Sequence, residues 1–598
     1  MTTPASRPSH QDGSYPRPQL QRSRWADLCG SWDFAVARAD TPAEVEFDRQ
    51  ITVPFPPESP ASGVGETGYL GEVWYRRRLS PEDLTAAGLD DQGDRLVLRF
   101  GAVDYRARVW LGGTYVGEHT GGQTPFGFDV TSVVRAADGP LELVVQAVDD
   151  PHDAAQPRGK QDWQREPHVI WYHRTTGIWQ PVWLEAVPAQ HVAGLAWLPD
   201  VPGASVAATV RLAQRPEADT WVTVQVSHEG ELLAEQRVRA LDQDVELRVH
   251  LARQANGQAY EDLLWSPERP TLLDATLTVE TDDDGGTGRS DVVGSYLGLR
   301  SVAVAHGTFL LNDRPYYLRS VLEQGYWPQT HLASPSADAL REEVELIRAL
   351  GFNSVRVHQK AEDPRFLYWA DRLGLTMWGE TANAYAFSPR SVQALTTEWV
   401  ELVRRDVSHP CIVTWVPLNE SWGVQHGAHD PAQRHYAIGL ANLTRALDPT
   451  RPVVSNDGWE HTDSDILSIH DYSPTGTEIR ARYGTPEAVR ELLAGIGPAG
   501  RRLQLREDVR DQPVMLTEFG GVSFAARHEG DWGYSTAADA GDFEARLRDL
   551  LDAVRDSALA GFCYTQLTDT GQETNGLLDE NRRPKLPVET LRSIITGK

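Results

Sequence analysis

The C-terminal half of the chain alternates short apolar runs with amphipathic stretches, and this alternation restricts its fold more than any other feature. Residues 336–350 place Leu340, Val344 and Ile347 on one helical face behind Ser336, a favourable N-cap. An apolar, β-branched run follows at 353–358, as expected of a strand buried in a parallel sheet. Further strands are expected at 316–320, 375–380, 412–418, 452–456, 466–470, 513–518 and 561–566, with helices at 364–373, 391–405, 432–447 and 542–557. Eight such strands separated by helices predict a (β/α)₈ TIM barrel over residues 302–598.

Two of these strands end in a glutamate. Glu420 follows Asn419 at the end of the 412–418 strand, and Glu518 ends the 513–518 strand. The C-terminal ends of barrel strands share one face, so both carboxylates are expected in one cleft. Paired carboxylates are typical of glycoside hydrolysis, and a retaining enzyme needs them about 5–5.5 Å apart. We therefore predict Glu518 as the nucleophile and Glu420 as the acid/base, kept protonated by burial.

The other predicted strands also end in polar side chains, which cost free energy in a core unless they have partners. Asn419 is expected to donate a hydrogen bond to the hydroxyl beside the reacting carbon, and Tyr472 to keep Glu518 ionised. His358 and His470 are candidates for binding sugar hydroxyls, and a core histidine satisfied by the backbone is an equal alternative for each. The other candidate substrate-binding residues are Glu380, Gln566, Trp422 and Trp532, with Trp327 and Trp378 as further stacking platforms.

The first 301 residues have the pattern of all-β structure. From 25 to 190, short strands alternate with Gly and Pro turns, which predicts a jelly-roll-like β-sandwich. Residues 191–301 repeat this signature at the size of an immunoglobulin-like sandwich. Residues 1–24 are rich in Pro, Ser, Arg and Gln, so we expect a disordered leader that is neither a signal peptide nor a membrane anchor. The corresponding expectation is a multidomain, cytoplasmic protein.

Composition excludes several classes of partner. The net charge of −28, from 57 Lys and Arg against 85 Asp and Glu, repels phosphate backbones and anionic membranes. We therefore expect a carbohydrate substrate, no nucleic acid and no membrane. Cys29, Cys411 and Cys563 are widely separated and indicate neither a disulfide framework nor a zinc site. No nucleotide fingerprint is present, so no organic cofactor is expected. The sequence leaves open a bound Mg²⁺ or Na⁺ and a homo-oligomeric assembly.

Several motifs resemble glycoside hydrolase family 2, which includes β-galactosidases, β-glucuronidases and β-mannosidases. The stretch W-V-P-L-N-E-S-W at 415–422 is similar to the acid/base motif of that family, and T-E-F-G-G at 517–521 is similar to its nucleophile motif. The resemblance implies these roles for Glu420 and Glu518. G-E-H-T-G-G-Q-T-P-F at 117–126 and T-G-I-W-Q-P-V-W-L-E at 176–185 are similar to its sugar-binding domain.

One departure from the family pattern concerns the choice of sugar. β-Glucuronidases of the family carry an Asn-x-Lys clamp for the sugar carboxylate, and the matching segment here, Q-E-T-N-G at 572–576, lacks that lysine. Glu573 in this segment is expected to repel a uronate. Lys360 and Lys585 stay open as cations supplied from elsewhere.

These observations lead to an expected retaining exo-β-glycosidase for neutral sugars, with β-galactosidase as the leading hypothesis. The alternatives are a β-glucuronidase, a β-mannosidase or furanosidase of the same family, and a catalytically inactive carbohydrate-binding protein. A transglycosylase would use the same residues with a different acceptor. The sequence does not separate galactose from other neutral sugars.

Overall fold

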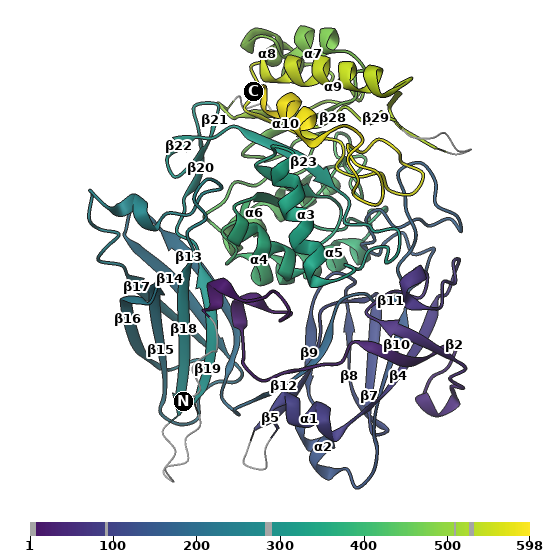
Figure 1. The fold of residues 1–598 in the computed structure, drawn as a ribbon, viewed down its shortest axis with the longest axis vertical. Helices are drawn as coiled ribbons and strands as arrows, with labels where there is room; N and C mark the ends of the chain where they lie inside the picture. The colour runs from purple at the N-terminus through teal and green to yellow at the C-terminus, as the bar shows by residue number, and fades with distance from the viewer. Residues whose placement is uncertain (1–6, 90–93, 282–289, 507–509, 525–530) are drawn as a thin grey trace.

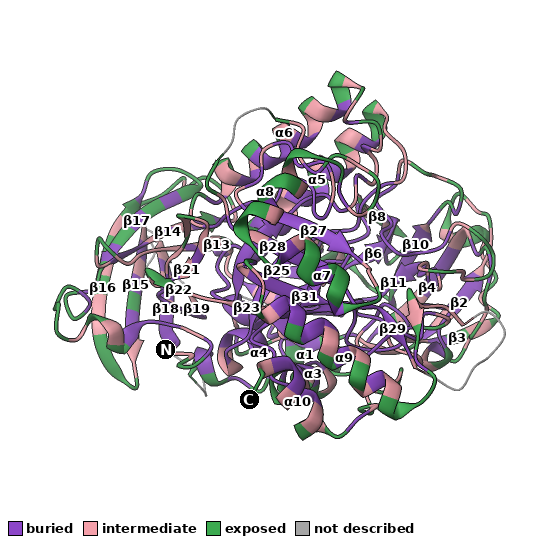
Figure 2. Ribbon diagram, turned by 90° about the horizontal axis from the view of Figure 1, so that it is seen from above, coloured by how far each residue is buried: buried purple, intermediate pink, exposed green. Residues whose placement is uncertain are grey.

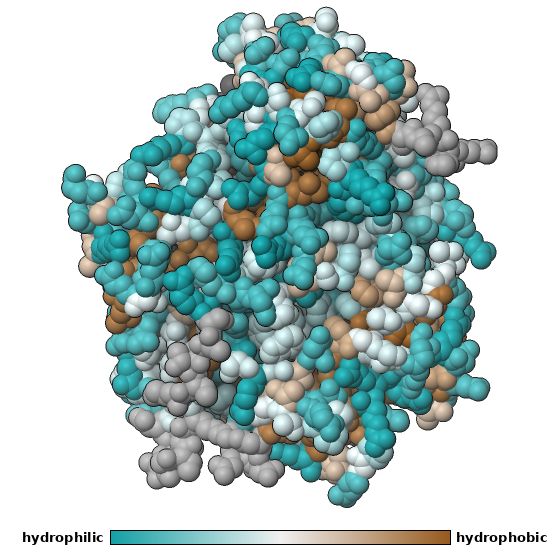
Figure 3. Space-filling model, viewed as in Figure 1, coloured by the Kyte–Doolittle hydropathy of each residue, from teal (hydrophilic) through white to brown (hydrophobic). Residues whose placement is uncertain are grey.

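The computed structural model describes residues 7–89, 94–281, 290–506, 510–524 and 531–598. Two β-domains lie next to each other, and an α/β domain rests across them (Figure 1). The predicted combination of jelly-roll-like sandwich, immunoglobulin-like sandwich and TIM barrel is confirmed. Within the described residues no helix has both the length and the apolar character needed to cross a membrane. The face shown in Figure 3 is largely hydrophilic, with apolar residues in small groups.

The N-terminal sandwich packs a six-stranded sheet, in the order β3-β2-β4-β10-β7-β8, against a four-stranded sheet, β1-β12-β5-β9. Its core is apolar side chains from both inner faces, such as Phe34, Leu98 and Val109. The strands are β1 (Ala26–Asp27), β2 (Gly30–Val36), β3 (Arg49–Val53), β4 (Glu72–Leu79), β5 (Arg95–Phe100), β6 (Val103–Asp104), β7 (Arg106–Leu111), β8 (Thr114–Thr120), β9 (Phe126–Asp129), β10 (Leu141–Val148), β11 (Gly177–Ile178) and β12 (Val182–Val187), with helices α1 (Pro81–Ala87) and α2 (Thr131–Ala136).

The second sandwich has the three-plus-four arrangement of an immunoglobulin-like fold, with sheets β13-β14-β17 and β16-β15-β18-β19. Along its central strand Val222, Val224 and Val226 are buried in alternation with more exposed residues, as the period of a strand requires. The strands are β13 (Val192–Asp200), β14 (Ser205–Leu212), β15 (Thr220–His228), β16 (Glu231–Ala240), β17 (Asp244–His250), β18 (Leu273–Thr281) and β19 (Asp291–Leu297).

The barrel contains a parallel seven-stranded sheet in the order β26-β25-β24-β23-β31-β28-β27. Its strands are β23 (Leu318–Glu323), β24 (Ser354–Val357), β25 (Thr376–Glu380), β26 (Ile412–Val416), β27 (Leu467–Asp471), β28 (Val514–Phe519) and β31 (Gly561–Tyr564). The short strands are β20 (Val302–Ala305), β21 (Thr308–Leu311), β22 (Arg314–Pro315), β29 (Val522–Ser523) and β30 (Ser535–Thr536).

The strand predicted at 452–456 is replaced by single bridges. Val453 pairs with Trp415 of β26, and Asp457 pairs with Asn419. No ladder to β27 forms over these described residues because side chains take the backbone donors: Val453 N–H donates to Asp465, and Ser455 N–H donates to the Ser464 hydroxyl. The segment still closes the barrel between β26 and β27.

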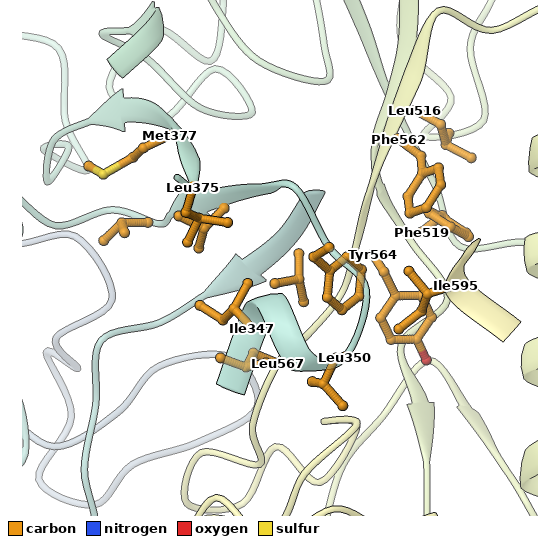
Figure 4. Packing of buried hydrophobic residues seen from close by; sticks show 14 of the residues in the cluster. Ile347, Leu350, Leu375, Met377, Leu516, Phe519, Phe562, Tyr564, Leu567 and Ile595 are labelled. Carbon is orange, nitrogen blue, oxygen red and sulfur yellow. The ribbon is translucent and has the colours of Figure 1, made fainter. Parts of the chain in front are cut away.

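Helices cover the outside of the barrel sheet, and their starts follow capping chemistry. Ser336 accepts a hydrogen bond from Ala339 N–H at the start of α3, and Ser388 caps α5 in the same way. The helices are α3 (Ala337–Ala349), α4 (Pro364–Leu373), α5 (Pro389–Asp406), α6 (Pro431–Leu447), α7 (Gly476–Tyr483), α8 (Pro486–Ala494), α9 (Ala540–Arg555) and α10 (Val588–Thr596). Figure 2 shows buried strands at the centre, and Figure 4 shows α3 residues Ile347 and Leu350 near strand residues such as Tyr564.

The prediction of a disordered leader is wrong over residues 7–24, and residues 1–6 lie outside the described residues. Ser9 N–H donates to Asp274 of β18, Gln21 forms a bridge with Gly294 of β19, and Tyr368 of α4 donates to the carbonyl of Gln11. The segment forms only two 3₁₀ turns, Pro8–His10 and Pro18–Leu20. It is ordered by polar partners on other domains, which its own composition does not reveal.

Arg22 is the main polar link of this leader, and its removal is expected to destabilise the protein. Its buried guanidinium lies 2.8 Å from Asp291 of the second sandwich and 3.2 Å from Glu185 of the first. Arg22→Met removes the cation paired with buried Asp291, whereas Glu185 keeps Arg99 at 3.3 Å, so the expected cost is about 3–5 kcal/mol. We expect a clear fall in the midpoint of thermal unfolding. Arg211→Met removes the exposed pair with Asp244, worth about 0–1 kcal/mol, and serves as the control. Equal midpoints for the two variants would contradict the linking role.

Candidate active site

Glu420 and Glu518 meet at the C-terminal ends of the barrel strands. Glu518 lies in β28, and Glu420 follows β26 by four residues. One oxygen of Glu420, one oxygen of Glu518 and a ring nitrogen of His470 all lie within 4.8 Å of one another. Oxygens this close fit a retaining pair, whose carboxyl groups lie about 5–5.5 Å apart, better than an inverting pair, which needs about 6.5–9.5 Å.

Arg356 of β24 holds the site together, although the sequence did not single it out as functional. Its guanidinium is fully buried and donates to Glu380 (2.9 Å), Glu518 (2.8 Å) and the side-chain oxygen of Asn419 (2.6 Å), and lies 2.8 Å from Asp457. Several carboxylates around one cation hold the pKa of Arg356 above its ordinary value, against the effect of burial. A charged residue within an otherwise apolar buried strand was the sequence signal that could have found it.

Glu518 is held in its ionised form. One carboxylate oxygen accepts from Arg356, and the other accepts from the Tyr472 hydroxyl at 2.5 Å. Burial alone would raise the pKa of Glu518, but the positive charges of His470 and Arg356 lower it below its ordinary value. The geometry is the one expected for Tyr472.

His470 lies between three carboxylates instead of facing free hydroxyls. Its Nδ1 is 2.7 Å from Glu420, and its Nε2 is 2.8 Å from Asp457 and 3.5 Å from Glu518. Burial opposes a charged imidazole, yet Glu518 and Asp457 raise the pKa of His470 to about 10. The ring is therefore a cation at neutral pH, and both of its N–H groups are engaged.

The backbone at Glu420 adopts a conformation that side chains disfavour. Glu420 has φ +49° and Ser421 has φ +57°, in the left-handed region. Glu420 N–H donates to the carbonyl of Asp457, and the Ser421 hydroxyl donates to Glu460 at 2.6 Å, so the turn is fixed on both sides. Such strain is found where a side chain must be aimed. The side chain of Glu420 is 16% exposed, and its protonation by burial stays a prediction.

Asn419 and Glu380 both accept a hydrogen bond from Arg356, but they differ in whether a polar group stays available to a substrate. Asn419 accepts from Arg356 through Oδ1, which fixes its amide so that the NH₂ group is available to a substrate hydroxyl. Both carboxylate oxygens of Glu380 instead accept hydrogen bonds from the protein, one from Arg356 and one from the backbone N–H of Gln359. His358 is buried 3.1 Å from Glu380, and burial together with Arg356 lowers its pKa. Glu380 thus positions Arg356.

The loop after β31 ties the site to the N-terminal sandwich. Gln566 accepts from Gln324 (2.6 Å) and donates to Asn575 (2.8 Å), and Asn575 donates to Glu573 (3.0 Å). Glu573 also accepts from the hydroxyl of Tyr172, a residue of the sandwich. Burial raises the pKa of Glu573. The carboxyl group expected to repel a uronate is therefore buried and hydrogen-bonded to protein groups.

The four predicted tryptophan platforms separate into two groups. Trp378 is buried in an apolar cluster with Leu318 and Val413, so it belongs to the core and not to the rim. Trp327 has the Arg582 guanidinium 3.5 Å above its ring centroid and lines a separate cavity with that arginine. Trp532 is partly exposed next to Glu573, and Trp422 follows Glu420 by two residues. The binding roles of the last two stay predictions.

A cavity of about 480 Å³ opens beside Glu420. Five aromatic side chains from two domains surround it: Trp163, Trp171, Tyr385, Trp422 and Trp459. Trp171 of the sandwich and Trp422 of the barrel are nearly parallel, with centroids 6.1 Å apart. The cavity therefore lies at the domain interface, on the side of the acid/base candidate.

Within the described part of the chain, two clusters each bring three potential metal ligands together. The first is Glu420, His470 and Glu518, which already satisfy one another and Arg356 by hydrogen bonds. The second is Asp371, His409 and Cys411, where Asp371 accepts from the other two. Burial raises the pKa of the Cys411 thiol, so it is neutral and a poor metal ligand. Neither donor set is arranged to prefer a cation over its present partners.

The chain belongs to glycoside hydrolase family 2. Residues 302–527 match the family model described as "Glycosyl hydrolases family 2, TIM barrel domain", and residues 18–184 match the model of its sugar binding domain. It is therefore related to glycoside hydrolases along most of its length, as the motifs implied.

The relatives are named for uronic acids. The chain is 26% identical over 567 residues to the β-glucuronidase of Sus scrofa, covering 86% of this chain and 80% of the relative. It is 24% identical over 535 residues to that of Streptococcus agalactiae, covering 84% and 83%. In fold it is similar to a family 2 β-galacturonidase from Eisenbergiella tayi (TM-score 0.73, 20% identity, 97% of each chain) and to a β-D-glucuronidase of Dictyoglomus thermophilum (TM-score 0.74, 18% identity, 98% and 99%).

These relatives overturn the prediction of a neutral sugar with β-galactosidase as the leading hypothesis. That prediction rested on Glu573 and on the missing lysine of the 572–576 segment. The structure shows Glu573 hydrogen-bonded by Tyr172 and Asn575, two contacts that the segment's sequence does not reveal. The alternative named at the outset, a β-glucuronidase of the same family, agrees better with the relatives.

His470 also gives the site a predictable dependence on pH. Its pKa is about 10 in the folded state, above the ordinary 6.5, so its charge stabilises the fold fully below pH 6.5. This stabilisation is lost as the pH rises from 6.5 through 10. We expect the thermal midpoint of the wild type to exceed that of His470→Asn most at pH 6 and progressively less toward pH 10. A gap that widens with pH would contradict a charged His470.

Proposed function

We propose that this chain is a retaining exo-β-uronidase that hydrolyses terminal β-linked uronic acids. The observation that carries the proposal is the pair of Glu420 and Glu518, whose oxygens lie within 4.8 Å of each other at the barrel mouth. The relatives named β-glucuronidase support the choice of a uronic acid. Gln566, Asn575 and Glu573 form a buried, hydrogen-bonded chain after β31, which supports a closed end of the site and therefore action on a terminal unit.

In the first step, Glu518 attacks the anomeric carbon of the uronide. Its ionised form, held by Arg356 and Tyr472, supplies the electron pair of the new carbon–oxygen bond. The glycosidic bond breaks at the same carbon, and Glu420 gives its proton to the departing oxygen. Asn419 donates its amide N–H to the hydroxyl beside the reacting carbon, a contact that strengthens in the transition state.

In the second step, water cleaves the glycosyl-enzyme. Glu420, now ionised, takes a proton from a water that enters where the leaving group was, and the oxygen of this water bonds to the anomeric carbon. The bond to Glu518 breaks, and its carboxylate returns to Arg356 and Tyr472. The charged ring of His470 at 2.7 Å from Glu420 steadies that carboxylate between the two steps. Two inversions give overall retention.

Alanine variants of the two glutamates test both roles. We expect Glu420→Ala and Glu518→Ala each to lower kcat on aryl β-glucuronide or β-galacturonide by about three orders of magnitude or more. Azide fills the space of the missing carboxylate. With Glu420→Ala it intercepts the glycosyl-enzyme and gives the β-azide, whereas with Glu518→Ala it attacks the substrate directly and gives the α-azide. NMR of the products distinguishes the anomers.

The matched control is Glu345→Ala, which removes a carboxylate that is 45% exposed on α3. It should retain wild-type turnover. Substantial activity in Glu518→Ala without azide, or the same azide anomer from both variants, would overturn the assignment. A wild type that hydrolyses none of the uronides would overturn the proposed substrate.

A further inference from the structure

The site contains a buried cation that the mechanism does not use. The chain has only four lysines, at 160, 360, 585 and 598. Lys360 is paired with Glu362 at 2.9 Å, and Lys585 is paired with Asp569 at 2.7 Å. Both candidates from the sequence are therefore neutralised by their own carboxylates.

Lys160, in a loop of the N-terminal sandwich, has no such partner. Its residue is only 8% exposed, and among the described residues no carboxylate lies within 4.0 Å of its ammonium. Nζ instead lies 5.3 Å from the ring centroid of Trp422, two residues after Glu420. Burying an ammonium is costly unless an anion approaches it, and the carboxylates around Lys160 lie beyond ion-pair distance, so this position offers a place for an anion.

The backbone of Lys160 is fixed against the barrel. Arg158 and Gly159 N–H donate to the carbonyl of Asn383, and Tyr385 donates to the carbonyls of Gly159 and Gln161 at 2.7 Å. Gly159 has φ +58°, and a Cβ there would lie 2.2 Å from the carbonyl oxygen of Gln359. Only glycine permits this close approach.

The same contacts connect Lys160 to the catalytic strand. The side-chain oxygen of Asn383 accepts from Asn419 N–H at 2.9 Å, and its NH₂ donates to the carbonyl of Pro417. The main chain of Asn383 therefore holds the loop that carries Lys160, and its side chain holds the segment from Pro417 to Asn419 that leads to Glu420. The backbone that carries Lys160 is therefore fixed relative to the segment before Glu420 by contacts between the two domains.

The charges of the sugar site respond to this ammonium. Burial raises the pKa of Glu573, and Lys160 is the largest influence opposing that rise. Burial, then Arg356 and then Lys160 lower the pKa of His358. Burial raises the pKa of Glu518, and the charge of Lys160 helps to lower it, after His470, Arg356 and His358. The charge of Lys160 is therefore felt at Glu573, His358 and Glu518, three residues at the carboxyl end of the barrel.

We propose that Lys160 binds the carboxylate of the uronic acid and makes the enzyme select uronides over neutral sugars. This inference rests on the proposed function and names the residue responsible for its substrate class. The cation comes from the sandwich and reaches the site beside Glu573, whose loop lacks the lysine expected there. The buried, unpaired ammonium and a sugar carboxylate supply each other's counter-charge.

The test compares Lys160→Met with Lys360→Met on p-nitrophenyl β-D-glucuronide, β-D-galacturonide, β-D-galactoside and β-D-glucoside. We expect Lys160→Met to lower kcat/KM on the uronide that the wild type prefers by about 10- to 100-fold, mostly through KM. Turnover of the neutral glycosides should hold or rise. Inhibition by free D-glucuronate should weaken by a similar factor, while inhibition by D-glucose stays the same. Lys360→Met loses a paired lysine and should keep the wild-type ratio of uronide to neutral activity.

The possible outcomes separate the two proposals. If the wild type hydrolyses uronides and Lys160→Met keeps the same uronide preference, Lys160 is not the carboxylate ligand. Equal losses on uronides and neutral sugars would show a structural role and also overturn the inference. A wild type without uronide activity would overturn the proposed function first. Lys160→Arg, which keeps the charge, should recover part of the uronide preference.

The cavity beside Glu420 carries a second inference independently. The geometry points to this cavity of about 480 Å³ as the site of the leaving group, because Glu420 lines it and must protonate the departing oxygen. Its aromatic walls suit a ring with an apolar face, either an aryl group or a second sugar. Trp171 contributes from the sandwich and stacks against Trp422. This inference also rests on the proposed glycosidase activity.

Trp171→Ala tests the leaving-group cavity. For each substrate the variant is compared with the wild type, using methyl β-D-glucuronide, 4-methylumbelliferyl β-D-glucuronide and a β-D-glucuronosyl disaccharide. We expect a loss of about tenfold in kcat/KM for the substrates with a ring as leaving group and little change for the methyl glycoside. A loss confined to the aryl substrate or to the disaccharide identifies which ring the cavity takes. Equal losses on all three, or none, would overturn the inference.

Discussion

The buried guanidinium of Arg356 is the interaction on which the rest of the site depends. Glu380, Glu518, Asn419 and Asp457 come from different barrel segments, and each has an oxygen 2.6–2.9 Å from this one group. The donors of a planar guanidinium point in fixed directions, so all four contacts form only if each partner side chain is itself held in place. The ionisation of Glu518 and the orientation of the Asn419 amide both follow from it. The barrel therefore positions Arg356, and Arg356 in turn positions Glu518 and Asn419.

His470 complements this arrangement from the opposite strand. It is a second cation among Glu420, Asp457 and Glu518, and it lies closer to Glu420 than to Glu518. The two glutamates consequently differ in environment although they are close neighbours. Glu518 is enclosed and doubly hydrogen-bonded, whereas Glu420 is partly exposed at the wall of a cavity. This asymmetry is what a nucleophile and an acid/base require.

Sequence patterns predicted the parts of this molecule that depend on local chemistry. Helix α4 begins and ends as predicted from Pro364 to Leu373, and Ser336 caps α3, because helical periodicity and capping are short-range effects. Glu420 and Glu518 were found because strand ends in a barrel share one face. The bridge at Val453 was predicted as a full strand, because competition from the side chains of Ser464 and Asp465 is a tertiary effect.

The parts that escaped prediction depend on contacts between distant segments. The leader residue Arg22 contacts carboxylates that lie 163 and 269 residues away in the sequence, and Glu573 accepts a hydrogen bond from Tyr172, 401 residues away. The local periodicity of a sequence gives no signal for pairs so far apart. Glu573 was interpreted as a repulsive charge because its partners were invisible in the sequence. The sugar was accordingly predicted from one loop of the barrel, whereas the residues around the site come from two domains.

The hydrogen bonds of Asn383 give this two-domain construction an evolutionary consequence. The sandwich loop around Gly159 is attached to the barrel through its main-chain groups, and this attachment depends on glycine at 159 but not on the side chain of Lys160. The barrel keeps the glutamates and the reaction, and the sandwich can change what it presents to the sugar without altering that machinery. Exchange of N-terminal domains between members of the family would then change the sugar specificity without changing the catalytic residues of the barrel.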